Sequence, residues 1–305
     1  MKKSLLSLIT LIIISCGSAN SQEAVNHLFA QRDSSLSMDI YYPDEISEKN
    51  PVIIFMFGGG FVAGSKSGER NVAFCRTLTN HGYITAAIDY RLGLKGAGKV
   101  GITHTKPLKE AIRMAVEDLY SATLFLLENA QELKIDPELI IICGSSAGAI
   151  SVLQGDYELA NRRDIASSMP ANFRYAGVIS LAGAIMSYDG KPKYRVHPPA
   201  PTMMLHGTDD KLVFYNKTQI FNFGVFGTNA ITKQFEKYNY PYMTIRYRDM
   251  GHEIADVPMK ANISEIVLFI NEYVIEKRHL KTDIIIKDSA LEPYMGKLTP
   301  AKLYK

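Results

Sequence analysis

Short apolar runs alternate along this chain with segments in which apolar residues recur at helical spacing. Runs rich in β-branched residues are typical of strands covered on both faces of a sheet, and they predict strands at residues 38–42, 51–57, 83–88, 139–143, 176–181, 202–205 and 243–247. Helical spacing predicts helices at residues 107–133, 147–160 and 265–276. Strands that alternate with helices favour right-handed crossovers. We therefore expect one α/β domain over residues 35–280, with a mostly parallel central sheet and helices on both faces.

The first residues have the order of an export signal. Lys2 and Lys3 precede an apolar run at residues 5–14, which is too short to span a bilayer because a spanning helix needs about 20 residues. A buried N-terminal helix is the alternative, but the charge-then-apolar order and the polar stretch that follows favour export. We expect residues 1–21 to be this signal and the protein to be a periplasmic, secreted or membrane-anchored protein of a bacterium.

Two cleavage positions stay open. Residues 13–16 resemble the lipobox of bacterial lipoproteins, in which the cysteine, here Cys16, is lipidated and becomes the new N-terminus. Residues 19–21 fit the small-x-small rule of ordinary signal peptidase equally well. A lipid anchor at Cys16 is therefore the one membrane contact that the sequence predicts.

Composition narrows the possible partners. The chain has 305 residues, of which 47% are hydrophobic, and a formal charge of +3, which fits one large core and gives no sign of a nucleic-acid partner. Cys75 and Cys143 are isolated, so they indicate neither a disulfide framework nor a cysteine-based metal site. Residues 281–305 lack periodicity, and we expect them to form a surface extension.

Residues with catalytic chemistry follow four of the expected strands. In open α/β sheets such residues collect at the carboxyl ends of strands. In chain order these ends carry a glycine loop, a serine pair, an aspartate pair and a histidine, at residues 58–60, 145–146, 209–210 and 252. A histidine can activate a serine, a carboxylate fixes the histidine tautomer, and backbone N–H groups stabilise an oxyanion. The pattern predicts acyl transfer without a cofactor or metal.

Five motifs give residues 35–278 a family resemblance, namely "FGGGFVAG", "GYITAAIDYRL", "GSSAG", "HGTDDKLV" and "GHE". This region resembles the α/β-hydrolase superfamily, in its esterase/lipase group with an HGGG-type oxyanion loop. The nearest subgroup looks like the exported bacterial esterases related to acetylxylan and feruloyl esterases. The resemblance implies the α/β-hydrolase fold and a nucleophile at the third letter of G-x-S-x-G. That position is Ser146, not Ser145.

The order Ser, acid, His in such enzymes implies the other two members of a triad. Two histidines follow the acid loop, and His252 is the expected base because His279 lies in a charged helix end. The resemblance assigns the acid to Asp210, with Asp209 as the alternative that would otherwise form the turn. Two residues close to these in the sequence are expected to have local roles. Asp249 would shape the loop of His252, and His206 would pack and form a local hydrogen bond.

The resemblance also implies an oxyanion hole made of backbone N–H groups. Gly59, Gly60 and Ala147 are the expected donors, and Gly58 would serve the turn. The chain departs from the family at Phe57, where a histidine usually braces the loop by hydrogen bonds. We expect the phenyl ring to brace it by burial instead.

These features predict a serine carboxylic-ester hydrolase that forms an acyl-enzyme and acts on short-chain or carbohydrate-linked acyl esters. A prolyl-oligopeptidase-like peptidase is one alternative, although the chain has no length for the usual propeller domain. A non-catalytic hydrolase-fold binding protein is the other, although no triad member is missing. Insertions at residues 186–201 and 212–242 are expected to rim the pocket with aromatic side chains, namely Tyr188, Tyr194, Phe214, Tyr215, Phe221, Phe223 and Phe226.

Overall fold

The computed structural model describes residues 23–97, 105–295 and 298–304. The expected export signal at residues 1–21, including Cys16, lies outside these residues. Within them, no helix is both long and apolar enough to cross a membrane.

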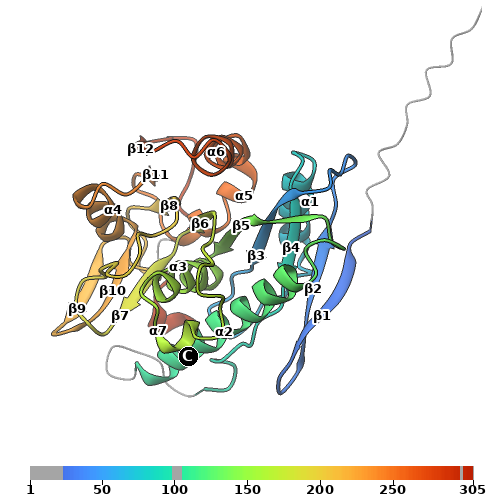
Figure 1. Ribbon diagram of the computed structural model, residues 1–305. Helices are drawn as coiled ribbons and strands as arrows, with labels where there is room; N and C mark the ends of the chain where they lie inside the picture. Colours follow the sequence, from blue (N-terminus) through green and yellow to red (C-terminus); the bar gives the residue numbers. More distant parts are fainter. Residues whose placement is uncertain (1–22, 98–104, 296–297, 305) are drawn as a thin grey trace, which may run out of the picture.

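A mostly parallel sheet forms the centre of the molecule (Figure 1). In the described part of the chain it has nine strands in the order β1-β2-β4-β3-β5-β6-β8-β11-β12, and the expected fold class is confirmed. β2 pairs antiparallel with β1 and β4, and every pairing from β4 to β12 is parallel. The strands are β1 (Val25–Gln31), β2 (Ser35–Tyr41), β3 (Asn50–Met56), β4 (Ile84–Ile88), β5 (Ile135–Ser145), β6 (Gly177–Leu181), β8 (Thr202–Gly207), β11 (Tyr242–Tyr247) and β12 (Lys281–Ile286).

Helices cover both faces of this sheet. α2 packs against α3, and α1 packs against α6 (Figure 1). The helices are α1 (Glu69–Thr79), α2 (Lys106–Glu128), α3 (Ala147–Ala160), α4 (Thr228–Lys237), α5 (Pro258–Ala261), α6 (Ile263–Phe269) and α7 (Pro300–Leu303). Shorter turns are η1 (Asp164–Ala166), η2 (His252–Ala255) and the π-helical η3 (Ile270–Ile275), and a small antiparallel sheet joins β7 (Ala184–Ser187), β10 (Phe223–Gly227) and β9 (Lys217–Ile220).

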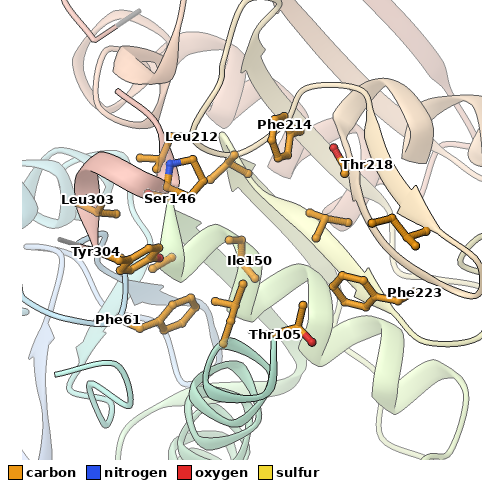
Figure 2. A pocket seen from close by; sticks show the side chains of 17 residues that line it. Phe61, Thr105, Ser146, Ile150, Leu212, Phe214, Thr218, Phe223, Leu303 and Tyr304 are labelled. Atoms are coloured by element: carbon orange, nitrogen blue, oxygen red, sulfur yellow. The ribbon is translucent and has the colours of Figure 1, made fainter. Parts of the chain in front are cut away.

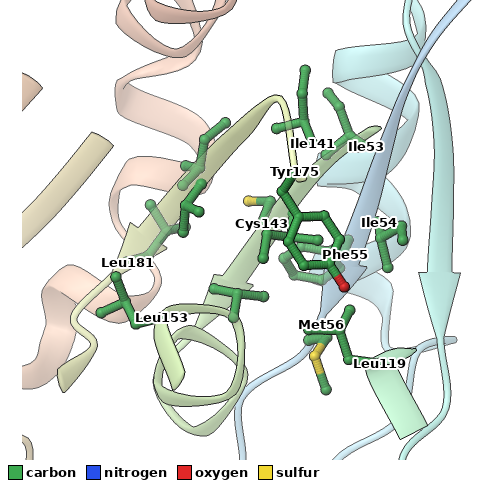
Figure 3. Close-up of a cluster of buried hydrophobic side chains, with 14 of the residues drawn as sticks. Ile53, Ile54, Phe55, Met56, Leu119, Ile141, Cys143, Leu153, Tyr175 and Leu181 are labelled. Atoms are coloured by element: carbon green, nitrogen blue, oxygen red, sulfur yellow. The ribbon is translucent and has the colours of Figure 1, made fainter. Parts of the chain in front are cut away.

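The core lies between the central strands and these helices. Residues 52–56 of β3 and 140–145 of β5 are buried because both faces of the sheet are covered there. Figure 3 shows Phe55 and Cys143 in one buried cluster that also includes Leu153 of α3 and Leu119 of α2. Phe55 meets Phe74 of α1 edge to face, with ring centroids 5.2 Å apart. The strand ends that carry the expected site therefore rest on a closely packed base.

Phe57, where the chain departs from the family motif, is buried just after β3. Its side chain is 2% exposed and stacks on Tyr90, with ring centroids 4.5 Å apart. The Tyr90 hydroxyl donates a hydrogen bond of 2.8 Å to the Phe57 carbonyl oxygen. A Cβ atom at Gly64 would lie 2.6 Å from the ring, so the glycine loop folds directly over it. Packing thus braces this loop, as expected.

The sheet extends beyond the expected domain at both ends. β1 adds an antiparallel edge strand, and Lys281–Ile286 pairs in parallel with β11 as β12. The expected surface extension at residues 281–305 is therefore wrong for these six residues. Exposed and half-buried residues alternate along β12, and its apolar run consists of only three isoleucines, residues 284–286, which is shorter than the run of four or more that marks a buried strand.

Truncation of Phe57 tests its role as a packing brace. We expect Phe57→Ala to lower the free energy of unfolding by about 3 kcal/mol, because it leaves a cavity beneath the glycine loop. Phe221→Ala is the matched control, since Phe221 is 94% exposed, and it should change stability by less than about 0.5 kcal/mol. Urea unfolding of both variants measures the difference. Equal, small losses would show that the Phe57 ring does not brace the loop.

Candidate active site

Ser146 occupies a sharp turn between β5 and α3. Its backbone has φ 51° and ψ −113°, a conformation that residues with a side chain rarely adopt. The Ser146 N–H donates to the carbonyl oxygen of Leu181 on the neighbouring strand β6, at 2.9 Å. The turn therefore holds the serine at the carboxyl end of the sheet, and its side chain faces a cavity.

The two glycines of "GSSAG" allow this turn to form. A Cβ atom at Gly144 would lie 2.3 Å from the carbonyl carbon of Gly148, and one at Gly148 would lie 2.1 Å from the carbonyl oxygen of Met56. Both distances are far below any real contact, and the atoms that they meet belong to the backbone. The first turn of α3 can therefore pack against the ends of β3 and β5 only with glycine at these positions.

Ser146, His252 and Asp210 form a continuous hydrogen-bonded chain. Ser146 Oγ lies 2.7 Å from His252 Nε2, and His252 Nδ1 lies 2.7 Å from Asp210 Oδ2. All three side chains are at least 91% buried. Since the carboxylate accepts from Nδ1–H, the Nε2 atom is left as the acceptor that faces the serine hydroxyl. The structure thus brings together the three residues that the sequence predicts.

The Asp210 carboxylate is held in its ionised form. Its Oδ1 accepts hydrogen bonds from the N–H groups of Leu212 and Val213, at 2.9 and 3.0 Å. Burial by itself would raise the pKa of this carboxyl, but hydrogen bonds from His206 and His252 outweigh burial and hold the pKa well below its usual value. A fixed negative charge beside His252 stabilises the imidazolium that forms when this histidine takes a proton.

His206 is a partner of this carboxylate that the sequence analysis did not assign to the site. Its Nε2 lies 2.9 Å from the Val213 carbonyl oxygen and 3.2 Å from Asp210 Oδ2, and its Nδ1 lies 2.9 Å from the Thr228 hydroxyl. Two acceptors face Nε2, so we assign the proton to that nitrogen. His206 therefore holds the same carboxylate oxygen, Oδ2, that accepts from His252 Nδ1. The sequence feature that could have indicated this role is the position of His206, at the end of β8 and four residues before Asp210.

The other residues weighed for these roles lie elsewhere. Asp209 is exposed and accepts from the hydroxyl of Thr208, while Asp249 is exposed near Lys287. His279 is also exposed. Ser145 is buried, and its hydroxyl donates to the carbonyl oxygen of Ala255 at 2.8 Å, which ties the serine turn to η2.

The expected oxyanion donors flank Ser146. Gly59 and Gly60 have φ values of 138° and 64°, so the loop uses backbone conformations that favour glycine. Gly60 and Ala147 line the same cavity as Ser146. Ala147 begins α3, and the first N–H groups of a helix have no partner within it. The N–H group of Ala147 is therefore available to a negative oxygen beside the serine, as the loop glycines Gly59 and Gly60 are expected to be.

Two cavities of different character meet at Ser146. One is an apolar cavity of about 130 Å³, which extends from Ser146 and Ala147 past Ile150 to Phe223 (Figure 2). The other is a wider cavity of about 810 Å³ that includes His252 and polar residues such as Arg70 and Asp256. The surroundings of the serine are thus apolar on one side and polar on the other.

The expected aromatic rim is only partly present. Phe214 and Phe223 line the apolar cavity. Tyr194 packs against Phe235 instead, and Phe221 is exposed to solvent. In the described residues no group of acidic, histidine or cysteine side chains is arranged to hold a metal ion.

The ionised state of Asp210 predicts a pH effect on stability. Its lowered pKa means that its contribution is complete above the ordinary value near 4 and is lost as the pH falls toward the folded-state pKa. The gap in unfolding free energy between the parent and Asp210→Asn should therefore shrink as the pH falls from 6 to 2.5, as urea unfolding can measure. Asp209→Asn, at the exposed neighbour, should show no such trend. A gap for Asp210→Asn that stays constant with pH would contradict this assignment.

Parts of the sequence are similar to those of known proteins. The BD-FAE family model matches residues 38–185, somewhat less than half of the chain. Gut esterase 1 of Caenorhabditis elegans is 32% identical over 122 residues, which are 40% of this chain and 21% of that protein, and carboxylesterase 5A of Ovis aries is 32% identical over 122 residues, which are 39% and 30%. The chain thus spans less than a third of the length of these curated relatives.

Solved structures extend the likeness in fold to most of the chain. The apo form of Thermogutta terrifontis esterase 2 superposes with a TM-score of 0.61 at 19% identity and covers 86% of this chain and 97% of that one. The butyrate-bound form of the same esterase gives a TM-score of 0.60, also at 19% identity, and covers 86% and 96%. With the parallel sheet and the serine turn, these likenesses show that the chain has the α/β-hydrolase fold.

Proposed function

We propose that this protein is a serine carboxylic-ester hydrolase with Ser146 as nucleophile, His252 as base and Asp210 as acid. The observation that carries the proposal is the hydrogen-bonded chain from Ser146 Oγ through both His252 nitrogens to Asp210 Oδ2, with both distances at 2.7 Å. Esterases among the relatives and structural neighbours support the same chemistry.

The reaction would proceed by acyl transfer through the serine. His252 Nε2 takes the proton of the Ser146 hydroxyl while Oγ attacks the ester carbonyl carbon. The carbonyl oxygen becomes an oxyanion that accepts hydrogen bonds from the N–H groups of Gly59, Gly60 and Ala147, and such a donor is typically worth about 3 kcal/mol of barrier lowering. His252 then gives its proton to the leaving alkoxide, and the acyl group stays on Ser146. Water, activated by the same histidine, releases the acid.

The position of His252 determines which cavity receives which half of the ester. The leaving oxygen must lie within reach of Nε2, because it receives its proton there. Ser146 borders both cavities, whereas His252 borders the wider one. The alcohol therefore occupies the cavity of about 810 Å³, and the acyl group occupies the apolar cavity of about 130 Å³ on the other side of the serine.

This division supports a compact, apolar acyl group esterified to a larger polar alcohol. An apolar cavity of about 150 Å³ holds a benzene-sized group, so the acyl side suits a short chain. The alcohol side carries charged and amide groups such as Arg70, Asn71 and Asp256, which suit a hydroxyl-rich alcohol such as a carbohydrate. Thermogutta terrifontis esterase 2 has been solved with propionate and with butyrate, in keeping with a short acyl group here.

Export remains part of the proposal. The basic and apolar order of residues 2–14 and the alternatives at Cys16 and at residues 19–21 support a bacterial protein that acts outside the cytoplasm. Polymeric and carbohydrate-linked esters are accessible there. Mass spectrometry of the mature N-terminus from the native host would distinguish a lipidated Cys16 from ordinary cleavage.

Substitution of each serine of the pair tests the nucleophile. Ser146→Ala should abolish both ester hydrolysis and covalent labelling by a fluorophosphonate, because no hydroxyl then faces His252. Ser145→Ala is the matched control: it removes only a hydrogen bond to the Ala255 carbonyl, so labelling should persist. Intact-protein mass spectrometry would record the adduct. A folded parent that never labels would favour a non-catalytic binding protein, and labelling lost only in Ser145→Ala would move the nucleophile to that residue.

A substrate panel tests the assignment of the two cavities. We expect kcat/KM to be highest for acetyl to butyryl esters and to fall by about tenfold or more at octanoyl, since each methylene that does not fit costs roughly 1–3 kcal/mol. At a fixed acetyl group, bulky polyol alcohols should be accepted as well as small ones. Faster cleavage of matched peptide bonds than of esters would favour a peptidase. A preference for octanoyl esters would overturn the acyl-side assignment.

A further inference from the structure

The C-terminal residues 298–304 lie against the candidate active site, although they are far from it in the sequence. Pro300, Leu303 and Tyr304 line the apolar cavity, and Leu298 and Leu303 line the wider one. Leu303 thus borders both cavities. Figure 2 shows Leu303 and Tyr304 toward the end of the apolar cavity where Ser146 lies, with Thr218 and Phe223 toward the other end.

These residues contact the oxyanion loop directly. A Cβ atom at Gly60 would lie 2.7 Å from Leu303 Cδ2 and 3.6 Å from the Tyr304 hydroxyl oxygen. The Leu303 side chain therefore fills the space that a larger residue at position 60 would need. Burial raises the pKa of Tyr304 to about 12, so its hydroxyl stays neutral and brings no charge to Gly60.

A buried carboxylate fastens the start of this region to the histidine loop. Glu253 follows His252 and is fully buried. One of its oxygens accepts a hydrogen bond from the Gly251 N–H, and the other accepts from the Met295 N–H at 3.0 Å. A buried carboxylate is costly unless its oxygens are satisfied, so Glu253 favours the arrangement in which Met295 stays against the histidine loop.

We propose that residues 298–304 form the partition between the acyl and alcohol sides, with Leu303 as the specificity-determining residue and Glu253 as a positioning residue. This inference rests on the proposed ester hydrolysis and deepens it. With leucine at position 303, the wall between the two cavities is closed beside Ser146, and the acyl chain is confined to the apolar cavity that extends from Ser146 to Phe223. With a smaller residue, the apolar cavity opens into the wider one, and a longer acyl chain gains room.

Opposite substitutions at Leu303 test the partition. The substrates are p-nitrophenyl acetate, butyrate and octanoate, and the readout is the ratio of kcat/KM values, not activity alone. Leu303→Ala should raise the octanoate-to-butyrate ratio by about tenfold, and Leu303→Phe should lower the butyrate-to-acetate ratio by a similar factor. Ala301→Ser is the control, because Ala301 is exposed on the same short helix, and its ratios should stay within about twofold of the parent.

Glu253→Gln tests the anchor. Glutamine offers one acceptor oxygen in place of two, so either Gly251 or Met295 loses its partner. If Glu253 positions the partition, the octanoate-to-butyrate ratio should rise toward that of Leu303→Ala. If it only supports the fold, all three esters should slow by the same factor and the ratio should not move.

The outcomes separate this inference from the proposed function. Every variant is first labelled with the fluorophosphonate and its melting temperature is measured. A parent that does not label contradicts the hydrolase itself. If the parent labels and the folded Leu303 variants keep the parental chain-length ratios, the hydrolase stands and the partition is overturned.

Discussion

The strained backbone of Ser146 is the constraint on which the rest of the site depends. A residue with a side chain in this region of φ and ψ costs about 1–3 kcal/mol, and the surrounding structure must offset that cost. The hydrogen bond from the Ser146 N–H to Leu181 and the close packing of Gly148 on Met56 do so. Because the turn has no room to relax, the hydroxyl is fixed before any substrate binds, and it lies at the entrance of the first turn of α3.

The buried carboxylate of Asp210 extends this rigidity to the other members of the triad. It lies between two histidines, and two backbone N–H groups hold its second oxygen. A buried negative charge is tolerated only when its hydrogen bonds are complete. The loop after β8 and the loop after β11 are therefore held together by one anion, and the orientation of His252 follows from the position of Asp210.

Topology brings the strand ends of the site together, and the family resemblance singled out Ser146 from Ser145 and Asp210 from Asp209. Parallel strands end at the same edge of a sheet, so Ser146, Asp210 and His252 converge once β5, β8 and β11 are recognised. His206 lies at the end of β8. Nothing in a single sequence shows that its imidazole faces the carboxylate of Asp210 and not the core. Its role depends on the path of the loop back to Val213.

The contacts of the C-terminal region could not be predicted from the sequence, for a different reason. β12 is an edge strand whose exposed and half-buried residues alternate, and its apolar run of three isoleucines is too short to mark a central strand. The contact of Leu303 with Gly60 joins residues that are far apart in the sequence, and no local pattern encodes such a pair. What the sequence presents as an irregular tail is, in the folded protein, part of the wall around Ser146.

The orientation in which an ester can react at this site follows from the position of His252, which transfers the proton. Of the two cavities, His252 borders the wider one. Under the proposed mechanism, an ester bound in the opposite sense would place its leaving oxygen in the apolar cavity, away from Nε2. The alkoxide would then have to leave without a proton, which raises the barrier steeply because an unsolvated alkoxide is a poor leaving group. Two walls of unlike polarity alone would merely favour one orientation of the substrate. Together with a single histidine on the polar side, they make that orientation the one in which the chemistry can be completed.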